Sequence, residues 1–229
     1  MTQLKTQNLK LKTAPPLGVV ILGAGASSRM GRPKLLLPWG DTTVIGQIIR
    51  QWRELGAAQI AVVHRPDDEP LVEASKREML KGNAKNTLQR FNASTHFIVN
   101  PQPEHGMFSS IRCAARWRGW RREISSRAIV LGDQPHLQRN TLRALWEQAG
   151  RNPDAICQPV FNGRTGHPVI LPRGVFEELK HSRAKTLKDF LKPFYRRCVQ
   201  CPVADTGLLL DLDRPEDYDK AVKYHSGNL

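Results

Sequence analysis

Short runs of β-branched residues alternate with amphipathic stretches through the first two thirds of the chain, and this alternation constrains the fold more than any other feature. The runs predict buried strands at residues 18–22, 60–63, 95–99 and 128–131. The amphipathic stretches predict helices over residues 43–55, 108–120 and 140–149. Strands that alternate with helices need crossover connections, which make neighbouring strands parallel and place helices on both faces of the sheet. We therefore expect an α/β three-layer sandwich with a mostly parallel, Rossmann-like open sheet.

The pattern changes after Gly150. Strands are predicted at residues 155–160 and 168–171, and the turn-rich link between them is typical of a small antiparallel hairpin extension. Two short helices over residues 174–180 and 185–191, a strand near Cys198 and a closing helix that begins at Pro215 follow. Because the sequence contains neither an internal repeat nor a convincing linker, we expect residues 17–229 to form a single domain, preceded by a basic, disordered leader over residues 1–16.

Composition limits the class of protein. With 40% hydrophobic and 24% charged residues, the chain is unlike a disordered tail or a fibrous repeat. No apolar run approaches the roughly 18 residues that span a bilayer, and none follows the basic leader to make a signal peptide. The four cysteines are too few and too scattered for a secreted disulfide scaffold. We therefore expect a cytoplasmic protein with no membrane partner.

The formal charge of +14 suggests a partner that carries phosphates. Positive charge is densest around Trp117 and Trp120, in a stretch that contains Arg112, Arg116, Arg118, Arg121, Arg122 and Arg127. On a helix, residues 112, 116 and 120 share one face, so the stretch is either a basic groove with stacking rings or a solvated helix that its tryptophans anchor to the core. We favour the solvated helix, because no known nucleic-acid-binding module accompanies the stretch. Nucleic acid is therefore not the expected partner. The same positive charge could instead attract an anionic small molecule.

The first predicted strand runs into a glycine-rich loop, GAGASSRMGRPK, over residues 23–34. Glycines at the carboxyl end of a parallel strand let backbone N–H groups close on a phosphate chain. The small residues between the glycines and Arg29 keep that approach open, while Arg29 and Lys34 can offset the charge of a triphosphate. The loop therefore predicts a phosphate-binding site.

The spacing of this loop argues against two common nucleotide-binding motifs. A Walker loop needs Gly-Lys followed by Ser or Thr, whereas Lys34 lies between Pro33 and Leu35. A dinucleotide fingerprint needs a third glycine where Ser28 stands and an acid where the second strand ends, at His64-Arg65. An arginine there could accept a 2′-phosphate, so an NADP-dependent oxidoreductase remains an alternative. A purely structural glycine turn would not explain why Arg29 and Lys34 occur together.

The loop and the residues around it, LGAGASSRMGRPKLLLP, resemble the signature loop of the molybdopterin-type nucleotidyltransferases, which follows the pattern L-A-A-G-x-S-x-R-M-G-x-x-K. The likeness continues, in the family's order, through residues 100–101 with 106–110, 131–135, 163–168 and 211–217. These blocks cover nearly the whole chain, and the loop and the LGDQP block at residues 131–135 are the most specific of them. Within the family, the chain is most similar to the cytidylyltransferase members.

The resemblance implies a nucleotidyltransferase that uses Mg²⁺, or Mn²⁺ in its place, to transfer CMP from CTP to the phosphate of the molybdopterin molybdenum cofactor, with release of pyrophosphate. An apo-molybdoenzyme is the implied recipient of the product. Gly23 departs from the alanine usual in the cytidylyl members, which leaves GTP open as the substrate. A basic module that delivers cofactor without catalysis is the remaining alternative.

The resemblance also implies roles for particular residues. The implied nucleotide contacts are Leu22, Gly23, Ala24, Gly25, Ser27, Ser28, Arg29, Lys34, Gly106 and Ser109. Arg29 and Lys34 would stabilise the leaving pyrophosphate, and Arg164 and His167 would lie on the acceptor side of the cleft.

Two aspartates are the expected metal ligands. Asp133 follows a buried strand at the sheet edge where the glycine loop begins, and a carboxylate there suits a hard divalent cation that bridges phosphates. Asp211 matches the family's second metal-binding carboxylate. Because Asp211 and Asp213 alternate with leucines, an extended chain would direct both carboxylates one way. Asp213 is also placed to cap the helix that begins at Pro215.

Overall fold

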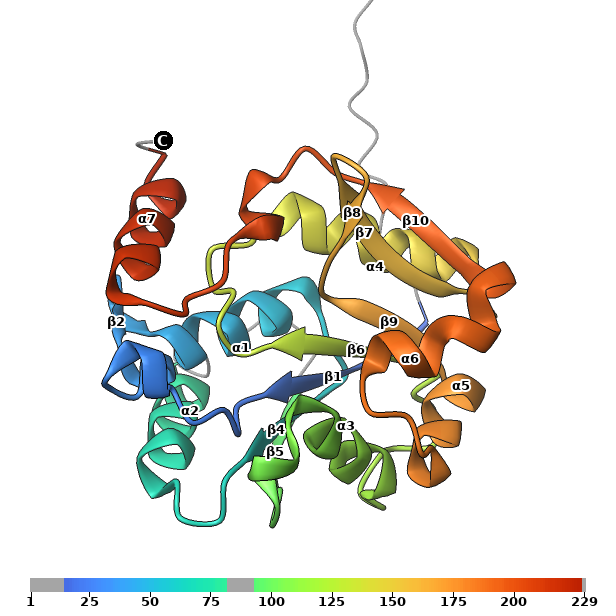
Figure 1. Cartoon of the computed structure of the whole chain (residues 1–229), viewed down its shortest axis with the longest axis horizontal. Helices are drawn as coiled ribbons and strands as arrows, with labels where there is room; N and C mark the ends of the chain where they lie inside the picture. The colour runs from blue at the N-terminus through green and yellow to red at the C-terminus, as the bar shows by residue number, and fades with distance from the viewer. Residues whose placement is uncertain (1–14, 82–92, 228–229) are drawn as a thin grey trace, which may run out of the picture.

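The computed structural model describes residues 15–81 and 93–227, so the predicted leader lies almost wholly outside the described residues. Within these ranges, eight strands form one sheet with the order β10-β7-β9-β6-β1-β4-β5, and β8 pairs with β7 (Figure 1). The strands are β1 (Leu17–Leu22), β4 (Gln59–His64), β5 (Ser94–Val99), β6 (Ser126–Leu131), β7 (Ile156–Phe161), β8 (Arg164–Thr165), β9 (Val169–Pro172) and β10 (Cys198–Pro202). A separate antiparallel pair consists of β2 (Pro38–Trp39) and β3 (Thr42–Thr43).

The strands β5, β4, β1 and β6 are parallel neighbours, as the alternating pattern predicts. The chain builds β1, β4 and β5 outward in one direction and then returns to place β6 on the other side of β1. The strand order therefore reverses between β1 and β6. At such a reversal the loops at the carboxyl ends diverge and leave a crevice, which is where open α/β sheets bind ligands.

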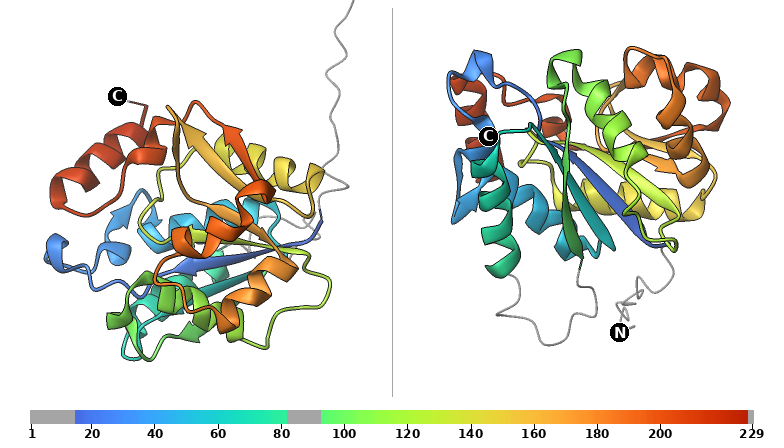
Figure 2. Two further views of the ribbon diagram at one scale, coloured as in Figure 1. Left: turned by 45° about the vertical axis from the view of Figure 1, so that its right-hand side comes forward. Right: turned by 90° about the horizontal axis from the view of Figure 1, so that it is seen from below.

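Helices cover both faces of the sheet (Figure 2). They are α1 (Val44–Leu55), α2 (Glu69–Lys81), α3 (Met107–Arg116), α4 (Arg139–Arg151), α5 (Arg173–Glu178), α6 (Leu187–Leu191) and α7 (Pro215–His225). Val19 and Ile21 of β1 share one core with α1, α2 and α4, while Val20 and Leu22 share the other with α3, α5 and α6. This alternation is the period of two expected of a strand buried on both faces, and it confirms the three-layer sandwich. In the described ranges, no helix has both the length and the apolar character to cross a membrane.

The predicted antiparallel hairpin is confirmed and is part of the main sheet. Strand β9 runs antiparallel to both β6 and β7, with Cys157 opposite Ile170. The turn residues Asn162 and Gly163 both have positive φ angles, 47° and 74°, which fits a tight two-residue turn from β7 into β8.

Helix α3 ends at Arg116, four residues before the end predicted from the sequence. Trp117 adopts an extended backbone, and its ring meets that of Trp120 edge to face at 5.1 Å. The indole N–H of Trp120 donates to the Ala114 carbonyl at 2.9 Å, so the chain turns back over the end of the helix. The predicted helical face shared by residues 112, 116 and 120 is therefore wrong.

Candidate active site

The glycine-rich loop leaves β1 at the reversal of strand order. The backbone N–H of Gly23 donates to the Val63 carbonyl at 2.8 Å, and the N–H of Gly132 donates to the Leu22 carbonyl at 3.1 Å. These bonds tie the ends of β4, β1 and β6 together. A Cβ on Gly132 would lie 2.6 Å from the Leu22 carbonyl oxygen, so the close approach of the two loops requires glycine there.

The loop then folds back on itself. Ser27 has a φ of 52°, an uncommon conformation for a residue other than glycine, and its hydroxyl accepts a bond from the backbone N–H of Lys34 at 3.3 Å. This contact returns the end of the loop toward β1 and β6, which places the Lys34 side chain beside Asp133.

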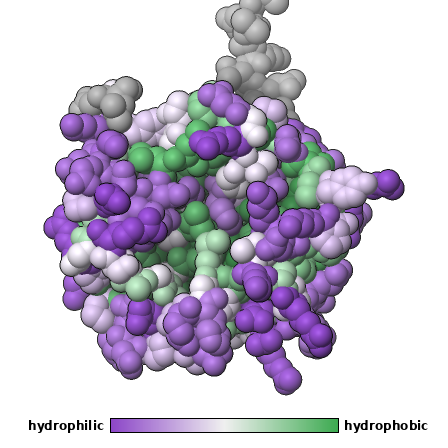
Figure 3. Space-filling model, in the orientation of Figure 1, coloured by the Kyte–Doolittle hydropathy of each residue, from purple (hydrophilic) through white to green (hydrophobic). Residues whose placement is uncertain are grey.

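Two cavities flank the loop. A main cavity of about 620 Å³ lies at the carboxyl ends of β1 and β6, and a side cavity of about 530 Å³ lies between the loop and the start of α2. Gly25 and Arg65 line both cavities, and a Cβ on Gly25 would have no heavy atom within 4 Å. The backbone at Gly25 is therefore open to a ligand. Figure 3 shows a hollow on this face, with hydrophobic residues in its floor and hydrophilic residues around it.

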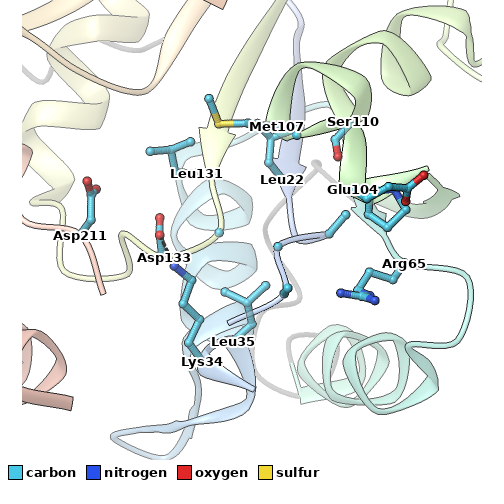
Figure 4. Close-up of a pocket in the computed structure, with 16 residues that line it drawn as sticks. Leu22, Lys34, Leu35, Arg65, Glu104, Met107, Ser110, Leu131, Asp133 and Asp211 are labelled. Atoms are coloured by element: carbon cyan, nitrogen blue, oxygen red, sulfur yellow. Dashed lines mark hydrogen bonds and ion pairs between the residues drawn. The ribbon is translucent and has the colours of Figure 1, made fainter. Parts of the chain in front are cut away.

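Lys34 and Asp133 form the central polar contact of the main cavity (Figure 4). The Lys34 ammonium lies 2.6 Å from Asp133 Oδ2 and 3.3 Å from Asp213 Oδ1, and Asp213 Oδ2 lies 2.8 Å from Nη1 of Arg29. The side chains of Lys34 and Asp133 are only 15% and 17% exposed, which limits solvent screening of their attraction. The loop cations and the carboxylates thus form one charged network.

Asp213 belongs to this network, so its predicted role as a helix cap is wrong. The backbone N–H of Arg214 at the start of α7 donates to Asp217 Oδ2 at 3.1 Å. Asp217 therefore supplies the capping acceptor, and Asp213 is free to pair with Arg29 and Lys34.

Asp211 lies on the opposite side of Asp133 from Lys34 and lines the same cavity (Figure 4). Its Oδ1 accepts a bond of 2.9 Å from the side-chain amide of Gln134. Removal from bulk water raises the pKa of Asp211, and the negative charge of Asp133 raises it further. The two predicted metal ligands therefore sense each other's charge across the cavity.

The segment that carries Asp133 is held by two other parts of the chain, helix α1 and the segment around residues 205–207. The side-chain amide of Gln51 in α1 donates to the carbonyls of Pro135 and Leu137, each at 3.0 Å. The buried carboxylate of Asp205 accepts a bond from the backbone N–H of Gln138 at 2.9 Å. A ring nitrogen of His136 lies 2.9 Å from the Gly207 carbonyl, and burial lowers the pKa of this histidine. Asp133 and Asp211 therefore come from segments that are bonded to each other.

Many of the predicted nucleotide contacts line a cavity. In the main cavity these are Leu22, Ala24, Gly25, Lys34 and Gly106, together with both predicted metal ligands; in the side cavity they are Gly23, Gly25, Ser27 and Ser28. Arg29 lines neither, because its guanidinium turns toward Asp213.

Ser109 is also outside the cavities. Its hydroxyl lies 2.7 Å from the Gly106 carbonyl and accepts a bond from the buried Asn100 amide at 2.8 Å. These partners hold the turn that precedes α3. The next residue, Ser110, lines the main cavity instead.

Arg164 and His167, predicted for the acceptor side, line neither cavity. Arg164 is exposed on β8. His167 points inward, with Nδ1 3.2 Å from the Ile129 carbonyl, and burial lowers its pKa. The charge of Asp133 opposes that shift, which places His167 on the far side of β6 within electrostatic reach of the site.

Several residues of the main cavity were not among the predicted contacts, and Arg65, Glu104 and Met107 are three of them; Arg65 was considered only as an acceptor of a 2′-phosphate. Arg65 and Glu104 lie across the cavity from Asp133, and Met107 lies above them at the start of α3 (Figure 4). For Arg65 a signal was present, because it directly follows the second predicted strand at the sheet edge where the loop begins. Glu104 lies in a connection whose path the sequence pattern does not define, and Met107, the first residue of α3, directly precedes the helix predicted over residues 108–120.

A mostly parallel sheet with a glycine-rich loop, a lysine and two aspartates at its reversal of strand order is typical of nucleotide-binding α/β proteins. The chain belongs to the MobA-like NTP transferase family, because the model of that domain matches residues 19–200. It is therefore a nucleotidyltransferase that acts on a nucleotide. The molybdenum cofactor cytidylyltransferase of Escherichia coli K12 is 24% identical over 210 residues, which cover 90% of this chain and 96% of that protein.

Solved structures show the same fold. Rv0371c of Mycobacterium tuberculosis is 25% identical with a TM-score of 0.64, over 92% of this chain and 99% of that one. A nucleotidyl transferase from Methanothermobacter has a TM-score of 0.71 at 19% identity, over 93% of this chain and 99% of that one.

Proposed function

We propose that this nucleotidyltransferase transfers CMP from CTP to the phosphate of the molybdopterin form of the molybdenum cofactor, releasing pyrophosphate. The likeness to the E. coli cytidylyltransferase supports both the nucleotide and the acceptor. The observation that carries the proposal is the juxtaposition of the open backbone at Gly25 with Lys34, Asp133 and Asp211 in one cavity. An apo-molybdoenzyme would then receive the product.

The chain's own residues account for binding and orientation. Backbone N–H groups of the loop between Ala24 and Ser28 would hold the triphosphate. Lys34, fixed by Asp133 at 2.6 Å, would stabilise charge on the leaving pyrophosphate. The acceptor phosphate attacks the α-phosphorus in line, so no protein nucleophile is required. Arg164 and His167, if they contact the acceptor, would do so from outside the cavities described above.

The residues of the cavity fit a divalent cation of the Mg²⁺ type. Asp133 and Asp211 offer hard oxygen donors. Burial first and the negative charge of Asp133 second raise the pKa of Asp211, and a dication would relieve the repulsion between the two carboxylates. In the described ranges, no group of three or more His, Cys, Asp or Glu side chains could hold a metal ion. Two carboxylates suit Mg²⁺, which keeps several water or phosphate oxygens as ligands. The bound ion would lower the charge repulsion between the phosphates and the attacking anion.

Manganese is an alternative ion, since a solved structure of Rv0371c, 24% identical to this chain, is a complex with manganese. Either ion would be held by Asp133 and Asp211. Comparing Mg²⁺ with Mn²⁺ in the assay below distinguishes them.

A panel of CTP, GTP, ATP and UTP, each titrated with Mg²⁺ and then assayed for transfer to molybdopterin cofactor, tests the proposal. We expect CTP to bind most tightly and pyrophosphate to form only when the acceptor is present. Tighter binding of GTP than of CTP would contradict CTP as the nucleotide substrate. Absence of transfer to the molybdopterin cofactor would contradict that cofactor as the acceptor. NADPH serves as the control ligand, and we expect it not to compete.

A further inference from the structure

A third concave region lies at the amino ends of the strands, away from the candidate active site. It is a cavity of about 600 Å³ between the end of α3, the segment 117–122, the start of β6 and α5. Arg127 lines this cavity and Asp133 lines the active site. The six chain positions between them correspond to roughly 20 Å of extended strand, so the two cavities lie at opposite edges of the sheet.

The lining of this arginine cavity is strongly cationic. Among the residues that the structure describes, Glu177 contributes the one carboxylate of the lining, and it accompanies seven Arg and Lys side chains: Arg116, Arg118, Arg121, Arg122, Arg127, Arg173 and Lys180. Glu123, outside the lining, pairs with Arg121 at 3.0 Å and so offsets a further charge. Among the described residues, the carboxylates of Glu177 and Glu123 therefore leave most of the positive charge of the cavity uncompensated.

Arg127 is the buried member of this set. It is 3% exposed, and its guanidinium lies 5.5 Å from the ring of Trp120 and 5.3 Å from that of Phe176. In the part of the chain that the structure describes, its Nε and Nη1 atoms are buried with no hydrogen-bond partner. Burial and the nearby charge of Arg173 lower the pKa of Arg127 to about 10, which leaves it a cation at neutral pH. Cation–π contacts offset only part of the cost of burying a charge.

Backbone carbonyls hold the surrounding cations in place. Arg173 donates from Nε to the Ile124 carbonyl at 3.0 Å and from Nη2 to the carbonyls of Ile124 and Arg122. Arg116 donates from Nε to the Lys180 carbonyl at 3.2 Å. Neutral carbonyls orient these guanidinium groups without neutralising them. The cavity is therefore lined by cations whose positions are fixed in advance by neutral carbonyls.

We propose that the arginine cavity is a second anion-binding site and that its ligand is a small molecule with phosphate groups, either a free polyphosphate or a nucleotide. A bound polyphosphate would supply the counter-charge for Arg127 and for the exposed arginines at the rim. Trp117 and Trp120, which line the same cavity, offer ring surface to a base.

The shape of the region favours a compact ligand over a nucleic acid. An extended groove along α3 would need Arg112 in line with Arg116, but Arg112 does not line the cavity, and the helix ends at Arg116. The cations instead converge on one concave region. Binding of an oligonucleotide is therefore an outcome that the test must be able to detect.

Calorimetric titration with inorganic pyrophosphate tests the proposal. The Lys34→Ala variant is used to weaken the nucleotide site, so that pyrophosphate reports on the arginine cavity. We expect saturable one-to-one binding, weakened at least about tenfold in the same background by Arg116→Gln with Arg118→Gln. The matched control, Arg77→Gln with Lys223→Gln, removes two exposed charges elsewhere and should leave the affinity unchanged. The unaltered chain should show two sites.

Arg127→Met tests the buried anchor. The variant replaces an uncompensated buried cation with an apolar side chain, so we expect no loss of thermal stability without anion and no stabilisation by pyrophosphate. A competition between CTP and pyrophosphate in the Lys34→Ala background distinguishes the two ligands. Tighter binding of CTP than of pyrophosphate identifies a nucleotide as the ligand. Equal affinities of CTP and pyrophosphate identify a free polyphosphate. The proposal would be overturned if the control pair weakened pyrophosphate binding as much as the Arg116 and Arg118 substitutions do. It would also be overturned if a single-stranded oligonucleotide bound saturably and pyrophosphate did not bind.

Discussion

Gly25 and Gly132 are both needed at the active site, but for different physical reasons. A Cβ on Gly132 would meet the Leu22 carbonyl oxygen at 2.6 Å, so glycine there permits the fold. A Cβ on Gly25 would meet no heavy atom within 4 Å, so glycine there leaves space for a ligand. Gly132 is therefore required by packing, whereas the backbone at Gly25 is open to a ligand.

Substitution separates these two roles. We expect Gly25→Val to lower CTP affinity at least tenfold with little change in unfolding free energy, because the added methyl groups occupy the space of the phosphates. We expect Gly132→Ala to cost about 1–3 kcal/mol of stability, because the backbone must shift. Urea unfolding and a CTP titration on both variants measure these effects. Unchanged CTP affinity in Gly25→Val would show that the loop does not hold the nucleotide.

Asp211 should make the metal-free protein respond to pH in an unusual direction. Its pKa is raised above the ordinary value of 3.8, so the native state binds this proton more tightly than the unfolded chain does. Stability contributed by the protonated form is therefore lost as pH rises through the raised pKa. We expect Asp211→Asn to be more stable than the parent chain at neutral pH without metal, by urea unfolding. A neutral-pH stability below that of the parent would contradict this prediction.

Among the structural elements, the longer strands of the main sheet and most helices were predictable from their buried apolar residues, whereas the two-residue strands β2, β3 and β8 were not predicted. Helix α2 was not predictable either, because its buried positions are Leu71, Ser75 and Glu78. Glu78 is satisfied by Arg50 Nε and by the Thr42 hydroxyl, each at 2.7 Å. A helix held by buried polar contacts shows no apolar stripe in its sequence.

The residues of the active site were also predictable where a local sequence pattern defines their positions. Asp133 and Asp211 follow a strand and an alternating pattern, so their positions were defined locally. The pairing of Asp213 with Arg29 and the exchange of Ser109 for Ser110 depend on how separate segments meet, which no local pattern records.

One such meeting of segments holds Asp211 in place. The buried carboxylate of Asp205 accepts bonds from the N–H groups of Gln138 and Gly207 and from the Tyr224 hydroxyl, at 2.9, 3.0 and 2.7 Å. This network joins the segment before Asp211 to the start of α4 and to α7.

Removing the Asp205 carboxylate should loosen all three elements. We expect Asp205→Ala to lower the unfolding free energy by about 1–3 kcal/mol, because it leaves buried donors without acceptors. Tyr224→Phe removes the bond to Asp205 and the 2.7 Å bond that the Gln138 side-chain amide donates to the Tyr224 hydroxyl, and it should cost about 1–2 kcal/mol. Asp205→Ala should also weaken Mg²⁺-dependent CTP binding, whereas Tyr224→Phe should not. Equal stability of the two variants would show that Asp205 does not organise the segment.

At the scale of the whole molecule, the sheet separates two cationic regions. The active site lies at the carboxyl edge, where aspartates accompany the cations, and the arginine cavity lies at the amino edge, where cations dominate. Among the described residues that line the two regions, Asp133 and Asp211 lie together at the carboxyl edge, and Glu177 is the carboxylate at the amino edge.

A ligand that bridges β1, β6 and the segment 205–213 should stabilise the whole fold. We expect CTP with Mg²⁺ at a hundred times its dissociation constant to add about 2.7 kcal/mol to the unfolding free energy. A chelator should remove the part that depends on metal. Thermal unfolding with CTP, Mg²⁺ and EDTA measures this. Equal stabilisation with and without metal would argue against a metal shared by Asp133 and Asp211.

We propose that Asp133 and Asp211 together bind a metal ion beside a phosphate chain that the loop after β1 holds. Mg²⁺-dependent CMP transfer by purified Asp133→Ala tests this arrangement, with circular dichroism and thermal unfolding as controls for the fold. We predict a folded protein that transfers no CMP. Turnover at the parental rate by a folded Asp133→Ala protein would contradict the claim.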